Sequence, residues 1–219
     1  MVKIKICGIT NSDEIQYLNI LKPDYVGFVF TKSKRQINSK KAKKLISLLD
    51  SNIKTVGVFK DNTINDILEI LFEVSLDVVQ LHGKENQDFI KELKDKSYKN
   101  INIWKALSIC DKENINEYLK GSLKNNLVDM LLIDGNNPGS GEDYSTQKLK
   151  EILKKSNKNI KYFLAGGVTP ENVSEKIKEA NPFGVDVSSG VEEITKENVR
   201  QKSFEKMKVF IKNVGNTEL

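Results

Sequence analysis

Three side chains capable of acid–base chemistry each follow a short apolar run of the sequence: Cys7, His82 and Asp134. A thiol has an ordinary pKa of about 8.5, so Cys7 needs only a modest decrease to act as a base near neutrality. A carboxyl beside an apolar core can have a raised pKa, which suits Asp134 to the role of a general acid. Structural interpretations stand beside these: a small buried hydrophobe for Cys7, a packing residue for His82 and a turn residue for Asp134.

Two turns built from small residues follow later apolar runs, at 165–168 and at 186–190. Turns of this kind bring backbone N–H groups close to a ligand, and two neighbouring ones form a seat for a phosphate group. The alternative is that the glycines serve the turn geometry alone. The candidate phosphate-binding residues are Gly166, Gly167, Ser188, Ser189 and Gly190.

A cationic loop at 32–35 ends in Arg35. Most of such a loop is expected to be solvated. The planar guanidinium matches a carboxylate through two parallel hydrogen bonds, so Arg35 is the candidate for binding a substrate carboxylate. Asn172 and Cys110 are expected to have structural roles, Asn172 as a capping or packing residue.

The remaining pattern of the chain alternates strands and helices. Helical spacing is clear at Ile64, Ile67, Leu68 and Leu71, and a helix is expected to begin at 38–39 and another at 169–172. The weakest helix assignment is 112–126, the last helix is expected at 195–210, and fraying is expected from Val214. Eight apolar runs have strand length: 3–6, 25–30, 55–59, 77–81, 101–106, 130–133, 161–164 and 184–187.

Eight strand–helix units favour a closed barrel over an open sheet, because parallel strands need crossover helices. No Pro/Gly/Ser-rich linker separates the units. The predicted fold class is therefore α/β, a single-domain (β/α)8 TIM barrel over residues 1–219, with the last few residues frayed. Active sites of such barrels lie at the C-terminal ends of the strands, with phosphate commonly bound after strands 7 and 8. All the candidate residues should then line one mouth.

The composition is that of a globular protein: 219 residues, 38% hydrophobic and 30% charged, with a net charge of +5. We find no apolar run long enough for a membrane span and no secretory signal, which predicts a cytoplasmic protein. The lysines are spread among glutamates rather than clustered, which argues against a nucleic-acid partner. The two cysteines have no metal-ligand spacing and are expected to be free thiols.

These pieces, in this order, resemble the phosphoribosylanthranilate isomerase family, a TIM barrel of tryptophan biosynthesis. Each segment alone is a weak signal, but six in order at barrel spacing are specific. The resemblance runs the full length of the chain. It is carried by KICGIT at 5–10, GFVF at 27–30 with SKR at 33–35, VQLHG at 79–83, LIDG at 132–135, AGGVTPENV at 165–173 and DVSSGVE at 186–192.

The resemblance implies an Amadori rearrangement of a phosphoribosylated anthranilate, without metal or cofactor. It implies that Asp134 is the general acid, that Cys7 is the general base and that Arg35 binds the anthranilate carboxylate. It gives His82 and Asp186 orienting roles near the substrate. Backbone amides around Gly167, Ser189 and Gly190 would hold the phosphate. The implied partner is a small phosphorylated substrate, with no nucleic acid and no membrane, and the protein would be a monomer or homodimer.

Two segments depart from the family pattern. The loop at 136–144 has a proline where a glycine is usual, which bears on loop closure rather than on chemistry. Residues 194–197 replace the usual glycine and Lys-Asp pair.

Three competing functions remain open. A histidine-pathway isomerase has two similar halves and a carboxylate at the end of strand 1, whereas this chain has Cys7 and no clear internal repeat. A non-catalytic phosphate-ligand binder would keep the phosphate seat with Cys7 and Asp134 dispensable. A nucleic-acid binder would associate in a strongly salt-dependent way.

Overall fold

The computed structural model describes residues 1–111, 115, 118, 127–135, 161–195 and 198–217. Most of the segment expected to form a weak helix at 112–126 lies outside the described residues. The proline-containing loop at 136–144 also lies outside the described residues.

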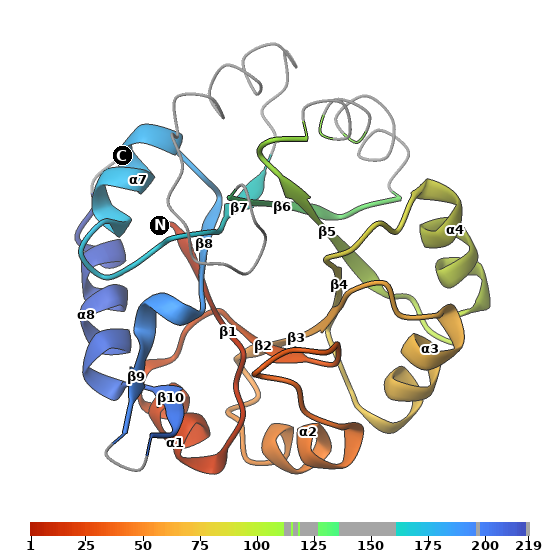
Figure 1. The fold of residues 1–219 in the computed structure, drawn as a ribbon, viewed down its shortest axis with the longest axis horizontal. Helices are drawn as coiled ribbons and strands as arrows, with labels where there is room; N and C mark the ends of the chain where they lie inside the picture. Colours follow the sequence, from red (N-terminus) through yellow and green to blue (C-terminus); the bar gives the residue numbers. More distant parts are fainter. Residues whose placement is uncertain (112–114, 116–117, 119–126, 136–160, 196–197, 218–219) are drawn as a thin grey trace.

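The centre of the molecule is a closed barrel of parallel strands, ordered around the ring as along the chain (Figure 1). Strand β8 closes the ring on β1, with Lys5 opposite Asp186 in the register. The expected eight strands and the barrel are therefore confirmed. The strands are β1 (Lys3–Cys7), β2 (Tyr25–Val29), β3 (Lys54–Phe59), β4 (Val78–Leu81), β5 (Asn102–Ser108), β6 (Met130–Asp134), β7 (Tyr162–Leu164) and β8 (Gly184–Val187).

Helices surround the barrel on the outside (Figure 1). Their beginnings follow from local sequence, because the side chains of Asn11, Asn38, Thr63 and Asn86 each accept a hydrogen bond from a first-turn amide. The start expected at 38–39 is confirmed. The described helices are α1 (Ser12–Leu21), α2 (Ser39–Ile46), α3 (Ile64–Glu73), α4 (Gln87–Lys96), α7 (Val173–Ala180) and α8 (Phe204–Gly215).

The apolar residues form two cores separated by the strands. The larger lies between the barrel and its helices, and the smaller fills the barrel interior. The interior core includes Trp104, whose ring stacks on Phe163 at a centroid distance of 4.7 Å, while Tyr25 meets Trp104 edge-on at 4.9 Å. Because these three rings lie near the starts of their strands, they close that end of the barrel and leave the other end for a site.

The segment after β8 differs from the expectation of one helix over 195–210. Strands β9 (Glu192–Ile194) and β10 (Arg200–Lys202) form an antiparallel ribbon, and α8 begins only at Phe204. Asn198 has a φ of 60°, and the Thr195 amide donates to the Val199 carbonyl, so the chain turns back here. The turn prevents helix formation before residue 204. Helix α8 continues past Val214, where fraying was expected to begin, to Gly215, and residues 218–219 lie outside the described residues.

Within the described part of the chain, no helix is long and apolar enough to cross a membrane.

Candidate active site

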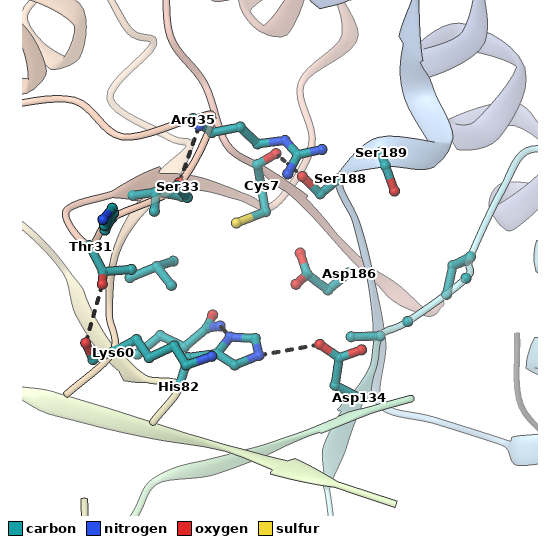
Figure 2. A pocket seen from close by; sticks show the side chains of 18 residues that line it. Cys7, Thr31, Ser33, Arg35, Lys60, His82, Asp134, Asp186, Ser188 and Ser189 are labelled. Atoms are coloured by element: carbon teal, nitrogen blue, oxygen red, sulfur yellow. Dashed lines mark hydrogen bonds and ion pairs between the residues drawn. The ribbon is translucent and has the colours of Figure 1, made fainter. Parts of the chain in front are cut away.

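A cavity of about 290 Å³ lies at the C-terminal ends of the barrel strands (Figure 2). Nine of the ten sequence-predicted site residues line it, and Gly190 is the exception. The expectation of a single mouth is thus met by residues from six different strand ends. The nine residues are Cys7, Arg35, His82, Asp134, Gly166, Gly167, Asp186, Ser188 and Ser189.

Cys7 is the last residue of β1, and its side chain is buried at the cavity wall. Two residues earlier on the same strand, Lys5 faces the same interior side and pairs with Asp186, Nζ to Oδ1, at 2.9 Å. Burial raises the pKa of the Cys7 thiol, while the Lys5 ammonium opposes that increase. The thiol therefore needs its neighbouring cation to become a base, a requirement not visible in the sequence.

Asp134 ends β6, and its carboxylate is held at both oxygens. Oδ1 accepts from the Gly135 amide at 2.7 Å, and Oδ2 lies 3.2 Å from Nε2 of His82. The other ring nitrogen, Nδ1, lies 3.0 Å from Nε2 of Gln80. Because an amide nitrogen only donates, Nδ1 accepts and Nε2 of His82 carries the hydrogen toward Asp134. His82 is thus held between Gln80 and Asp134, and Figure 2 shows its bond to Asp134.

Gln80 was not among the sequence-predicted site residues. It lines the cavity and is 1% exposed, and its Oε1 has no hydrogen-bond partner in the described structure. A buried acceptor without a partner is costly, so a ligand donor is its natural complement. Gln80 lies on β4, two residues before His82, so the two side chains point to the same face. This alternation is the only sequence signal that could have indicated Gln80.

The loop after β7 brings its backbone to the cavity through two left-handed glycines. Gly166 and Gly167 have φ of 79° and 61°, a region that disfavours other residues. Asn172 holds this loop, accepting from the Thr169 amide at 2.8 Å and donating to the Gly167 carbonyl at 2.8 Å. Asn172 thus has the structural role that the sequence predicted.

The loop after β8 packs on the loop after β7 through Gly190. A Cβ at this position would collide with the Val168 carbonyl oxygen. Gly190 therefore joins the two loops, whereas Ser188 and Ser189 reach the cavity. Gly190 does not line this cavity, and its glycine is explained by close packing; its part in phosphate binding stays a prediction.

Arg35 reaches the cavity from the loop after β2, and its guanidinium already holds a carboxylate of the protein. Nε donates to Glu192 Oε1 at 2.5 Å and Nη2 to Glu192 Oε2 at 2.7 Å. Despite burial, this hydrogen bonding and Lys202 lower the pKa of Glu192 to about 2. Glu192 and Lys202 were not among the candidate site residues, and strand β10, which carries Lys202, lies where a helix was expected.

The mouth of the cavity is cationic. Lys32, Arg35 and Lys60 line it together, which favours an anionic ligand. In the described ranges no group of three or more histidine, cysteine or acidic side chains could hold a metal ion. Cys110, by contrast, is an exposed cysteine just beyond β5 that forms no disulfide and does not line the cavity.

Comparison with known proteins agrees with this geometry. The sequence model of the N-(5'phosphoribosyl)anthranilate (PRA) isomerase family matches residues 4–213. The chain belongs to this family. A PRA isomerase of Clostridium beijerinckii is 50% identical over 98% of this chain and 97% of its own.

Solved structures of PRA isomerases share the barrel. One, of monomers generated from a dimeric enzyme of Thermotoga maritima, is 32% identical, with a TM-score of 0.78, and covers 99% of this chain and 100% of its own. Another, 31% identical with a TM-score of 0.79, covers 98% of this chain and 99% of its own. The second is a complex with reduced 1-(o-carboxyphenylamino)-1-deoxyribulose 5-phosphate, so a family member binds a phosphorylated carboxyphenyl compound.

Proposed function

We propose that this protein is the isomerase of tryptophan biosynthesis that converts N-(5'-phosphoribosyl)anthranilate to 1-(2-carboxyphenylamino)-1-deoxyribulose 5-phosphate. The observation that carries the proposal is the arrangement of one cavity. Cys7 and Asp134 face it from separate strands, and the guanidinium of Arg35 lies beside Ser188, where the loop after β8 begins (Figure 2). An acid, a base, a carboxylate-binding group and a phosphate seat are what this rearrangement needs.

Asp134 is the general acid of the ring-opening step. In its protonated form it donates to the furanose ring oxygen, the bond from that oxygen to C1 breaks and an iminium forms at C1. The Gly135 amide and His82 hold the two carboxyl oxygens and so aim the proton. Positioned general acids of this kind contribute about 10²–10⁴ to a rate.

Cys7 is the general base of the following step. Its thiolate removes the proton from C2 of the open sugar, and the electron pair neutralises the iminium to give an enolamine. Tautomerisation of the enolamine gives the ketone product. Lys5 supports this role because its ammonium stabilises the thiolate against the cost of burial.

The substrate has two anionic ends, and the cavity offers groups for each. Arg35 binds the anthranilate carboxylate, and amides around Gly167, Ser189 and Gly190 bind the phosphate. Gln80 Oε1 accepts a hydrogen bond from the sugar or from the anilino nitrogen, which supplies its missing partner. Asp186 keeps Lys5 in place beneath Cys7.

We further propose that residues 1–219 act as one domain in the cytoplasm, without cofactor, metal or nucleic acid. The oligomeric state is a monomer or homodimer, and the dimeric relative from Thermotoga maritima supports the second.

The test follows the decay of phosphoribosylanthranilate fluorescence without added metal in four proteins: wild type, Cys7→Ala, Asp134→Asn and Cys110→Ser. We expect rapid decay with wild type and a loss of at least about 100-fold with each of the first two variants. Cys110→Ser is the matched control for loss of a thiol and should retain wild-type activity. Survival of activity in Cys7→Ala and Asp134→Asn would contradict the mechanism, and no decay with wild type would contradict the function.

A further inference from the structure

Lys202 is a buried lysine that no step of the proposed reaction uses. It lies on β10, outside the barrel, yet it is only 1% exposed. Lysine is almost never buried unless it is paired, because its charge loses hydration there. A buried ammonium behind an active site therefore indicates a specific set of partners.

The partners of Lys202 belong to the site. Its Nζ donates to the carbonyl oxygen of Ser188 at 2.9 Å, to Ser188 Oγ at 3.3 Å and to Glu192 Oε1 at 2.8 Å. An ammonium has three hydrogens and no acceptor, so these three contacts use its full capacity. Each hydrogen of the Lys202 ammonium is thus directed at Ser188 or at Glu192.

One of these partners begins the phosphate side of the cavity. Ser188 is the first residue after β8, and its Oγ also donates to the Cys7 carbonyl oxygen at 3.0 Å (Figure 2). Lys202 consequently holds the chain at the C-terminal end of β8, where the loop that carries Ser189 begins.

The other partner reaches the carboxylate side. Glu192 holds Nε and Nη2 of Arg35, and its second oxygen also accepts from Arg200 Nη1 at 3.1 Å. Arg200 is more exposed than Lys202, at 42% of its side chain, and touches only the outer edge of the cluster. Lys202 is the member with direct bonds to both Glu192 and Ser188.

We propose that Lys202 is a positioning residue that holds the carboxylate-binding Arg35, through Glu192, and the phosphate-binding loop, through Ser188, in one fixed relation. It sets the spacing of the two anion sites and so selects a ligand with a carboxylate and a phosphate at matching separation. This inference rests on the proposed function, which assigns a carboxylate to Arg35 and a phosphate to the loop.

The test uses Lys202→Met with two half-ligands, anthranilate and inorganic phosphate, each titrated calorimetrically and as an inhibitor of the isomerase reaction. We expect both half-ligands to bind about tenfold more weakly, equivalent to about 1.4 kcal/mol each. KM should rise at least as much, and by a larger factor than kcat falls, because Lys202 touches neither the acid nor the sulfur of the base and acts on the Cys7 thiol only through its charge. Loss of only one half-ligand, or of kcat alone, would overturn the proposal.

Two matched variants separate position from charge. Arg200→Met removes a cation from the same Glu192 but leaves Ser188 untouched, so phosphate binding should stay at the wild-type value. Lys202→Arg keeps the charge with a longer planar group, and it should weaken both half-ligands. If Lys202→Arg binds both as well as wild type, charge alone suffices and the proposal fails. That result is decisive even where Lys202→Met does not fold.

The half-ligands also distinguish this inference from the proposed function. Wild-type protein that binds phosphate and anthranilate but leaves the fluorescent substrate unchanged contradicts the function only. Wild-type activity together with unchanged half-ligand binding in Lys202→Met contradicts the inference only.

Discussion

Two buried lysine–carboxylate pairs of the barrel are nearly equal in geometry and different in use. Lys5 on β1 meets Asp186 at 2.9 Å, and Lys105 on β5 meets Glu85 at 2.8 Å. All four side chains are almost entirely buried. A pair of this kind is weak evidence of net stabilisation, since desolvation offsets the attraction. Its surroundings must therefore explain why it is there.

The surroundings show that the Lys5–Asp186 pair belongs to the site and the Lys105–Glu85 pair to the scaffold. Around Glu85 the partners are backbone groups, because its oxygens accept from the amides of Asp61 and Gly83, and Lys105 donates to the Gly83 carbonyl. This pair fastens two loops. Around Lys5 the neighbours are Asp186, which lines the cavity, and the Cys7 thiol.

The two lysines also differ in the direction in which their pKa values are shifted. Burial lowers the pKa of Lys105 in spite of its carboxylate. For Lys5, Asp186 and Cys7 outweigh burial and raise the pKa. An ammonium that is held firmly charged beside a thiol is suited to stabilise a thiolate.

The largest expected effect comes from Lys5→Met. The substitution leaves Asp186 buried without its cation and removes the positive charge next to Cys7. We expect kcat/KM to fall about 100-fold and the free energy of unfolding to fall by about 3 kcal/mol. Steady-state kinetics and denaturant unfolding measure the two losses. Retained kcat/KM in a folded Lys5→Met protein would show that the Lys5–Asp186 pair does not serve catalysis.

Lys105→Met is the matched variant on the scaffold side. It leaves Glu85 buried without its cation, so unfolding free energy should again fall by about 3 kcal/mol. Activity at a temperature where the variant is folded should stay within about twofold of wild type, since Glu85 and Lys105 lie away from the cavity. A hundredfold loss of kcat/KM here would show that both pairs serve catalysis.

A smaller effect is expected in the pH dependence of the rate. The base form of Cys7 is the thiolate, and burial raises its pKa while Lys5 and Lys202 lower it and Asp186 raises it. The rate of wild type should therefore still increase with pH above about 8.5, the ordinary value for a thiol. In Lys5→Met the rising limb should move to higher pH. The pH profile of kcat/KM measures both, and an unmoved limb would separate Lys5 from the thiol.

The same thiol gives a weak pH dependence of stability with a definite sign. Because its pKa is higher in the folded than in the unfolded chain, folding favours the protonated form. The contribution is fully present below about pH 8.5 and is lost as pH rises through the folded pKa. Cys7→Ala should abolish this alkaline loss, as denaturant unfolding at pH 7 and pH 10 can measure.

The sequence predicted the barrel because each strand is a local apolar run and the strands are connected in order. It predicted the site equally well where a residue sits at a strand end, as Cys7 and Asp134 do. The two loops proposed to bind phosphate were predicted for a similar reason, since glycines mark the turns in which they lie. Local pattern was sufficient for all of these.

The interactions that bring distant residues together could not be predicted in this way. Glu192 and Lys202 come together beside Arg35 because β9 and β10 pair as an antiparallel ribbon, and their polar sequences have neither strand alternation nor an apolar face to reveal it. A sequence also does not show that the Cα of Gly190 packs against the Val168 carbonyl. The sequence likewise does not show that Oε1 of Gln80 lacks a hydrogen-bond partner in the described structure.

The aromatic floor of the barrel has a consequence for optical spectroscopy. Trp104 is the only tryptophan of the chain, it is buried, and it stacks on Phe163 in the interior of the barrel. Its fluorescence is therefore a single-site signal from the centre of the closed sheet rather than from the outer helices. Excitation at the red edge of tryptophan absorption, where tyrosine contributes little, follows the opening of the barrel without an added dye.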